Sequence, residues 1–345
     1  MTEYVATTPG LFPLPDPAKD RLAELKGHQK HDLISGEEGP EIRDAYANAR
    51  ETVVADQREA GLDRVVEGQL RWDDMLAHPL TVGDAVDTGG IVRYYDNNNF
   101  YRDPQVVDDL AATGDVAAEL DAASELLGEA APSSLQATLP GPYSLARLAT
   151  DEQYGDDEAF LDAVSELLAA EAEQFPAHET LFLLEPSLVT DAPGDDLAAA
   201  VPSAIDAVAD AVDSDVVVHT YWGALDETTY AHLMDADVEA LGFDLVAGDR
   251  EQTLYNVNEY GTKDAVALGV ADAQNTLVES ADTLGERLTW FEGQVPAQTF
   301  ERVYATPNAE PFYLPVSKHR EKLTALAAAV DVAADEIADT EEVTA

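Results

Sequence analysis

Short β-rich runs alternate with helical patterns along most of this 345-residue chain, and this alternation constrains the fold more than any other feature. One helical pattern ends at Gly61, a residue type that commonly terminates helices. Three segments carry apolar residues at helical spacing, namely 41–60, 195–212 and 318–337. Eight runs have the composition of strands: 4–8, 62–68, 134–139, 180–185, 215–219, 236–241, 265–270 and 302–305.

The repeat predicts an α/β protein, specifically a (β/α)8 TIM-type barrel with a long insertion after an early strand. A doubly wound open sheet is the alternative, but the chain has no GxGxxG or GxxxxGK[ST] motif that would support a nucleotide-binding version. We expect a single barrel over residues 1–335. The insertion, at about 69–131, is expected to form a hairpin and a helix over the barrel mouth. Residues 336–345 are expected to form an acidic, disordered tail.

The charge of the chain is extreme, because 69 acidic residues face 19 lysines and arginines and the formal net charge is −50. The acids are dispersed among apolar residues, which favours a folded protein with an acidic surface over a disordered chain. Such a surface repels itself at low salt, so we interpret it as an adaptation to a high-salt cytoplasm. Nucleic acid and anionic membranes are unfavourable partners for this field. Neither a signal peptide nor an apolar run of membrane-spanning length is found, so we expect a cytoplasmic protein.

The chain contains no cysteine, which excludes disulfides, thiolate nucleophiles and zinc sites built from cysteine. No HExxH spacing and no GxSxG motif is present. The familiar hydrolase and metalloprotease arrangements are therefore excluded.

Residues that end or follow strands are the candidates for chemistry, because active sites of barrels lie at the carboxyl ends of the strands. Arg71 could bind a carboxylate or a phosphate, or form an ion pair with one of many nearby acids. Glu185 ends an apolar run and is interpreted as a ligand-binding or structural hydrogen-bonding residue. His219 ends another run and is either a catalytic or ligand residue or a histidine with local partners. Residues 97–99, three asparagines flanked by aromatic residues, could bind an extended polar ligand or form a turn.

Seven segments resemble, in the same order, motifs of the cobalamin-independent methionine synthase family: 8–13, 60–75, 139–142, 184–188, 218–221, 269–280 and 307–310. The most specific of them is 269–280, which carries Asp272 and Glu279 in the pattern Gly-Val-Ala-Asp followed by Val-Glu-Ser. The resemblance implies a (β/α)8 barrel that transfers a methyl group from a folate donor to homocysteine on zinc.

The chain departs from the family at the metal. The resemblance places the zinc ligands, one histidine, two cysteines and one glutamate, at His219, Tyr221, Ala309 and near Gly242. A lone imidazole cannot hold catalytic zinc. At other motif positions, Leu184 stands where the family has an aspartate for the homocysteine amine, and Gln69 replaces a glutamate. We therefore expect no intrinsic cofactor.

Long enzymes of this family contain two such barrels, of which the first has lost its metal and helps to bind the folate. By resemblance, we expect this chain to be a metal-free, folate-binding barrel. It would act with a separate zinc-bearing barrel in a methyltransferase of the 5-methyltetrahydropteroyltriglutamate–homocysteine type, rather than alone. Small molecules, methyl-folate or homocysteine, are the expected substrates. The residues expected to bind them are Arg71, Arg93 and Arg102, which would hold a polyglutamate tail, and Asn97, Asn98, Glu185, His219, Asp272 and Glu279.

Two other readings remain. The chain could be a non-catalytic binding or regulatory protein of methionine and one-carbon metabolism. It could also be a homologous methyltransferase of different chemistry, similar to the related uroporphyrinogen decarboxylase barrels. A neighbouring gene for a second, cysteine-bearing barrel would favour the complex over both.

Overall fold

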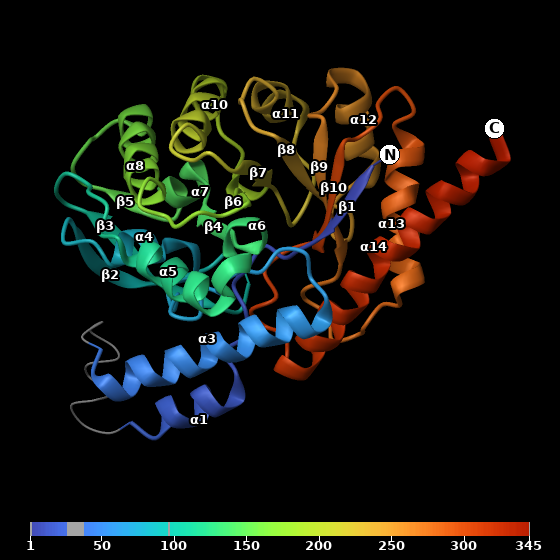
Figure 1. The fold of residues 1–345 in the computed structure, drawn as a ribbon. Helices are drawn as coiled ribbons and strands as arrows, with labels where there is room; N and C mark the ends of the chain where they lie inside the picture. The colour runs from blue at the N-terminus through green and yellow to red at the C-terminus, as the bar shows by residue number, and fades with distance from the viewer. Residues whose placement is uncertain (1, 26–37, 96, 345) are drawn as a thin grey trace.

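The computed structural model describes residues 2–25, 38–95 and 97–344, with side chains described as far as Glu336. Its centre is a curled sheet of parallel strands in the order β1-β10-β9-β8-β7-β6-β4 (Figure 1). The strands are β1 (Glu3–Ala6), β4 (Gln136–Pro140), β6 (Thr180–Leu184), β7 (Asp215–His219), β8 (Ala240–Asp244), β9 (Ala265–Ala271) and β10 (Arg302–Pro307). The chain is thus an α/β protein with a TIM-like arrangement of its sheet.

Helices occupy most of the gaps between these strands, as the alternating pattern predicts. The longer ones are α1 (Asp16–Ala23), α3 (Pro40–Ala60), α5 (Asp115–Leu127), α8 (Asp157–Ala172), α10 (Asp195–Ala209), α12 (Arg250–Tyr260), α13 (Ala281–Gln294) and α14 (Val316–Thr344). Shorter helices are α4 (His78–Thr81), α6 (Ala131–Ser134), α7 (Pro142–Arg147), α9 (Ser187–Thr190) and α11 (Glu227–Leu233), with 3-10 turns at Met75–Ala77 and Gly128–Ala130.

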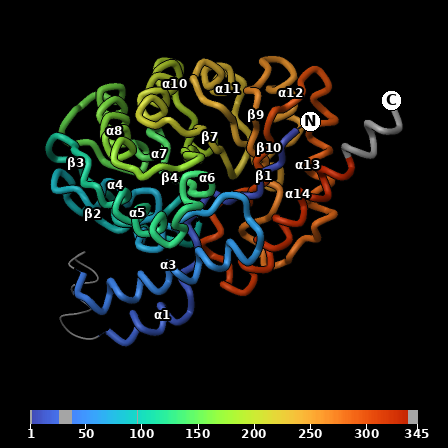
Figure 2. The backbone as a smooth tube through the Cα atoms, in the orientation of Figure 1, coloured from blue at the N-terminus to red at the C-terminus, as the bar shows by residue number. Residues whose placement is uncertain are grey.

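The long helix α3 begins and ends as its sequence predicts. Gly61 adopts a φ of 87° and its amide donates to carbonyls of the last helical turn, which ends α3. Helix α3 contacts α1 on one side and α14 on the other, and α14 packs along α13 (Figure 2). The backbone of α14 is helical to Thr344. The side chains after Glu336 lie outside the described ones, so the disorder expected over 336–345 stays a prediction.

The run 62–68, predicted as a strand, forms only one bridge, a parallel pairing of Val65 with Leu135. Side chains replace the missing ladder bonds. Val66 N donates to Gln57 Oε1 over 2.9 Å, Gln57 Nε2 donates to the Val66 carbonyl over 2.8 Å, and Ala6 N donates to Asp63 Oδ2 over 2.8 Å. The segment lies between β1 and β4, because its amides also donate to the carbonyls of Ala6 and Ser134.

The predicted strand 236–241 is shifted in the structure. Strand β8 begins at Ala240, and the Glu239 carboxylate instead accepts a hydrogen bond of 2.6 Å from Val216 N. Because the Glu239 carboxylate bonds to β7, β8 begins later than the apolar composition of 236–241 suggests.

The long segment before β4 forms a hairpin and a helix, as predicted. Strands β2 (Val86–Arg93) and β3 (Phe100–Val106) are antiparallel, and β3 also pairs with the short β5 (Thr150–Asp151). Tyr94 and Tyr95, in the turn of this hairpin, contact residues that follow β6, β7 and β10. The hairpin turn therefore reaches the carboxyl ends of the parallel strands.

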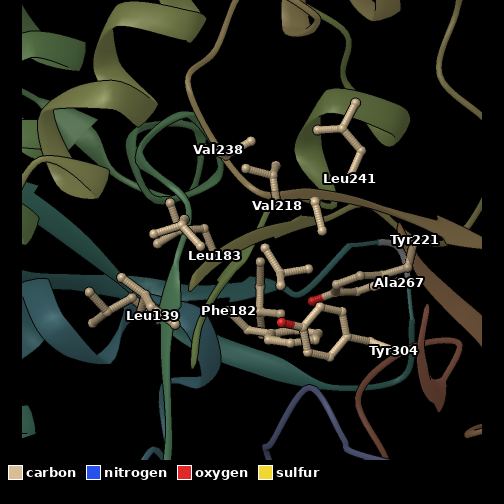
Figure 3. Packing of buried hydrophobic residues seen from close by; sticks show 14 of the residues in the cluster. Leu139, Phe182, Leu183, Val218, Tyr221, Val238, Leu241, Ala267 and Tyr304 are labelled. Atoms are coloured by element: carbon tan, nitrogen blue, oxygen red, sulfur yellow. The ribbon is translucent and has the colours of Figure 1, made fainter. Parts of the chain in front are cut away.

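The core consists of apolar side chains from the parallel strands and from the helices around them. Figure 3 shows part of this packing, with Phe182 and Tyr304 in edge-to-face contact at a centroid distance of 6.0 Å. These side chains fill the interior at that level and leave the polar residues to the strand ends. Within the described residues, no helix combines the length and apolar character needed to cross a bilayer.

Candidate functional site

The carboxyl ends of four neighbouring strands bring buried polar side chains together. Glu185 follows β6, His219 ends β7, Asp244 ends β8 and Glu310 comes shortly after β10. Each of these four residues is at most 1% exposed. We call this region, together with Tyr94, Tyr95, Tyr221 and Trp222, the mouth.

Glu310 is held by two phenols. Tyr94 of the hairpin donates to Glu310 Oε1 over 2.6 Å, and Tyr221, just after β7, donates to the same oxygen over 2.8 Å. The other oxygen, Oε2, is buried without a hydrogen-bond partner. Burial raises the pKa of Glu310 to about 7, against the opposing effect of the two phenol hydrogen bonds. The carboxyl group can therefore gain or lose a proton near neutral pH.

Glu185 has a different set of donors. It accepts hydrogen bonds from Tyr143 N, Ser144 N and Ser144 Oγ, at 3.0, 2.8 and 2.7 Å. Its side chain lies over Gly141, where an added Cβ would come within 2.2 Å of the carboxyl carbon. Burial raises the pKa of Glu185 to about 7 as well, despite these bonds. Its donors belong to the loop and helix that follow β4, so Glu185 joins the ends of β4 and β6.

The hairpin contacts both of these glutamate clusters through adjacent tyrosines. Tyr94 binds Glu310 directly, whereas the Tyr95 hydroxyl lies 2.7 Å from Ser187 Oγ. The amide of Ser187 in turn donates to Ser144 Oγ over 3.0 Å, and Ser144 binds Glu185. Tyr95 adopts a φ of 42°, an uncommon value for a residue with a side chain.

His219 is neutral at physiological pH, because burial lowers its pKa to about 4. Its Nε2 donates to the Asn308 carbonyl over 3.2 Å, and its Nδ1 is buried without a partner. The ring lies against Gly242, where an added Cβ would come within 2.3 Å of Nδ1. The structure thus places His219 in a packed environment in which glycine is required at position 242.

Asp244 is fully engaged by donors from three segments. It accepts bonds from Trp222 N at 3.0 Å, from Val246 N and Ala247 N at 2.8 Å each, and from Asn308 Nδ2 at 3.0 Å. Its carboxylate therefore organises the loops after β7, β8 and β10.

The residues at the mouth do not fit the zinc that the resemblance implies. Gly242 and Ala309 carry no ligand atom, and the His219 ring fills the space that a side chain at position 242 would need. The hydroxyl of Tyr221 is engaged with Glu310. Across the part of the chain that the structure describes, no three His, Asp or Glu side chains come together as a metal site.

The three arginines predicted to bind an anionic tail are not among the residues that form the mouth. Arg71 binds the carboxylates of Glu38, Asp115 and Glu119 at 2.8, 3.0 and 3.2 Å. Arg102 pairs with Asp74, and Arg93 is an exposed residue of β2. Ion pairing, the alternative considered for Arg71 from sequence, is what the structure records.

The other predicted site residues are divided between the mouth and its rim. Glu185 and His219 belong to the mouth. Asn97 approaches it, because its amide donates to the carbonyl of Tyr94 over 3.0 Å, whereas Asn98 is exposed. Asn97 also accepts a bond from Asn99 N, so these asparagines form the predicted turn. Asp272 and Glu279 brace the loop after β9: Asp272 N donates to Glu279 Oε1, and Glu279 Oε2 binds Lys322 at 2.6 Å.

Sequence reasoning missed Glu310 and Tyr94 as members of the site and treated Tyr221 only as a lost ligand. Glu310 follows a strand closely, as Glu185 does, and that rule could have singled it out. Tyr94 carries no comparable local pattern, because only the path of the hairpin brings it to the mouth.

Fold and site together define an α/β protein whose curled parallel sheet carries buried carboxyl groups at its strand ends. Residues 83–295, more than half of the chain, match the family model described as the cobalamin-independent synthase, N-terminal domain. The chain belongs to this family of cobalamin-independent methionine synthases, which confirms the resemblance seen in its sequence.

A curated relative is the 5-methyltetrahydropteroyltriglutamate–homocysteine methyltransferase of Salinibacter ruber (strain DSM 13855 / M31). It is 26% identical over 339 residues, which cover 86% of this chain and 42% of that enzyme. The chain therefore spans less than half the length of this relative.

Two solved structures share the fold. A B12-independent methionine synthase from Shewanella sp. W3-18-1, in complex with selenomethionine, superposes with a TM-score of 0.76 at 18% identity and covers 97% of this chain and 98% of its own. A putative vitamin-B12 independent methionine synthase from Listeria monocytogenes gives 0.68 at 15% identity, with 96% and 98% covered. At these identities the likeness establishes the architecture alone.

Proposed function

We propose that this chain is a metal-free methionine synthase-like barrel that acts with a separate zinc-bearing barrel. The observation that carries the proposal is the packing of His219 against Gly242, with Tyr221 engaged by Glu310, at the positions that correspond to the family's metal ligands. The match to the family's N-terminal domain supports a role beside a second domain of the family. In this role the chain would contribute to homocysteine methylation without turning over alone.

The architecture we propose is a closed (β/α)8 barrel over residues 1–335 with an insertion at about 69–131. The segment around Val65 would be the eighth strand, because its backbone bonds to Ala6 on one side and to Ser134 and Gln136 on the other. The contacts of Tyr94 and Tyr95 support an insertion that covers the carboxyl ends of the strands.

For the donor, we propose methyl-folate, bound between the hairpin and the partner barrel. The exposed Arg93 and the half-buried Arg102 lie on the hairpin, where an anionic polyglutamate tail could reach them. Asn97 and Asn98 of the hairpin turn, and Asp272 and Glu279 at the rim, remain the proposed polar contacts. Arg71 would act indirectly, because its ion pairs with Asp115 and Glu119 join the start of the proposed insertion to α5 within it.

Metal content tests the metal-free half of the proposal. Purified chain dialysed at high salt should hold close to no zinc, because its described residues offer fewer ligands than zinc requires. One tightly bound zinc per chain, with methionine formed by this chain alone, would overturn the proposal.

Activity tests the partner. The chain should be isolated from native cells at high salt together with a cysteine-bearing barrel, and methionine formation should require both proteins. If the cysteine-bearing barrel forms methionine equally well without this chain, the second candidate gains support: a non-catalytic binding protein of one-carbon metabolism. The observation in favour of that candidate is the mouth itself, which Tyr94 and Tyr95 occupy.

A further inference from the structure

Four aromatic rings gather over Glu310 at the mouth. The centroid of Trp222 lies 4.9 Å from that of Tyr221, 5.0 Å from that of Tyr95 and 6.1 Å from that of Tyr94. Tyr221 and Trp222 come from the end of β7, whereas Tyr94 and Tyr95 come from the hairpin. Glu310 is bound to Tyr94 and Tyr221, so a carboxyl group lies directly beside these rings.

Three polar atoms at the mouth are buried without hydrogen-bond partners: Glu310 Oε2 and Trp222 Nε1 of this cluster, and Nδ1 of the neighbouring His219. Among the described residues, no lysine, arginine or histidine forms an ion pair with Glu310. A buried carboxylate oxygen without a partner is costly, and a bound cation removes that cost. The cluster therefore has the properties of an incomplete cation site.

The chemistry of the cluster selects among cations. A primary ammonium group carries three N–H donors and needs about as many acceptors, but only one oxygen of Glu310 is uncommitted. A methylated onium group needs no acceptor, because aromatic faces and one negative charge are sufficient to bind it. Metal ions are disfavoured for the reason already given, the absence of further ligands among the described residues.

We propose that Glu310, Tyr221 and Trp222 bind a methylated onium group, such as a trimethylammonium or methylsulfonium group, in the space that the ring of Tyr94 occupies. This inference goes beyond the proposed function and holds whether or not the chain is a synthase subunit. Tyr94 acts as an internal occupant of the site: its ring is 0% exposed, and of the two phenols that bind Glu310 it is the one that comes from the hairpin.

Ligand entry follows from this arrangement. The hairpin turn must withdraw Tyr94, which breaks its bond to Glu310 and exposes Oε2 together with the faces of Tyr221 and Trp222. Tyr95 lies next to Tyr94 with a φ of 42°, a backbone conformation that is uncommon for a residue with a side chain. The onium methyl groups then replace the apolar surface of the withdrawn ring.

Calorimetric titration of the full chain with tetramethylammonium and trimethylsulfonium chloride, at constant high ionic strength, tests the proposal. Both probes should bind saturably, and ammonium chloride should bind at least about tenfold more weakly. Glu310→Gln should weaken binding of both probes about tenfold or more. Tyr94→Ala should strengthen it, because the variant lacks the internal occupant. The relative affinity of the two probes distinguishes a nitrogen from a sulfur onium ligand.

Two controls separate these effects from general ones. Glu129→Gln removes one charge at an exposed position, and Phe100→Ala alters the exposed face of the hairpin; neither should change the affinity. If Tyr94→Ala does not fold, as judged by circular dichroism, the comparison of wild type with Glu310→Gln still tests whether Glu310 binds the onium probes. Absence of saturable binding to folded wild type, equal binding by Glu310→Gln, or a preference for ammonium would each overturn the proposal.

Discussion

Glu310 and Glu185 are both buried at the carboxyl ends of the strands, but their hydrogen-bond partners differ. Burial raises the pKa of both carboxyl groups to about 7. Glu185 is surrounded by donors of the chain itself, which makes it a structural link between β4 and β6. Glu310 has one oxygen without a partner, and its donors include a hairpin residue. Of the two carboxyl groups, Glu310 is therefore the one that hydrogen bonds satisfy less completely.

The pH dependence of stability tests this difference. The folded-state pKa of Glu310 lies above its unfolded value, so its favourable contribution is present below about pH 4.5 and is lost as the pH rises through about 7. Glu310→Gln cannot ionise. Its free energy of unfolding relative to wild type should therefore rise by roughly 2–3 kcal/mol between pH 5 and pH 8.

Urea denaturation of both proteins at each pH, with salt held constant, measures that difference. The comparison cancels the buried histidines, whose lowered pKa values act in the opposite sense as the pH falls below 6.5. A constant difference between the two proteins across this range would show that Glu310 is ionised at no cost.

Gly242 is the residue on which the packing of His219 depends. An alanine Cβ there would meet His219 Nδ1 at 2.3 Å and the His219 Cα at 2.9 Å, so the strand or the ring must shift. Gly242→Ala should lower the free energy of unfolding by about 1–3 kcal/mol. Gly90→Ala, where no atom lies within 4 Å of the added carbon, is the matched control and should change stability little. Equal stability of both variants would contradict the packing described.

At the scale of elements, helix α5 is fixed by a carboxylate from α8. Glu171 is 4% exposed and accepts hydrogen bonds from four amides at the start of α5, those of Thr113, Gly114, Val116 and Ala117. These amides have no partners within the helix, and a negative charge is favourable at this end. One side chain of α8 thus holds the start of α5 in place.

Glu171→Ala should lower the free energy of unfolding by about 2–4 kcal/mol, because it leaves buried amides without acceptors. Hydrogen exchange should accelerate first in α5 and only afterwards in the parallel strands. Glu173→Ala, an exposed neighbour on the same helix end, serves as the control. Uniform acceleration across the whole chain would mean that Glu171 supports the fold generally rather than the insertion.

At the scale of the whole molecule, the net charge of −50 dominates. Basic side chains are largely used to join distant segments: Arg302 binds Glu3 and Asp215, and Arg320 binds Asp56. The remaining acids on the surface repel one another, and this repulsion extends farther when salt is dilute. We therefore propose that the folded state is adapted to a high-salt cytoplasm.

The thermal midpoint should consequently rise between about 0.1 M and about 2 M KCl, as the screening length falls from roughly 10 Å to a few ångströms. Circular dichroism at both concentrations measures it. Asp162→Asn with Glu166→Gln, two exposed acids of α8, should reduce the salt dependence without altering the core. Equal midpoints at the two salt concentrations would refute the halophilic interpretation.

The sequence by itself determined the α/β repeat, most strand positions and the family. Apolar periodicity and helix-ending residues such as Gly61 are local properties, and they persist in the folded chain because neighbouring residues impose them. It also placed Glu185 and His219 at strand ends, since a carboxylate or an imidazole directly after an apolar run is visible in one dimension.

Only the tertiary structure decided what occupies the mouth. Tyr94 and Glu310 are 216 positions apart, and the partner of a phenol at that separation has no local pattern. The same holds for Arg71, whose carboxylate partners lie at least 33 positions away, and for Gly242, whose requirement for glycine arises from the ring of His219. Periodicity reports which face of an element is buried, whereas contacts between elements depend on how the curled sheet and the hairpin bring distant side chains together.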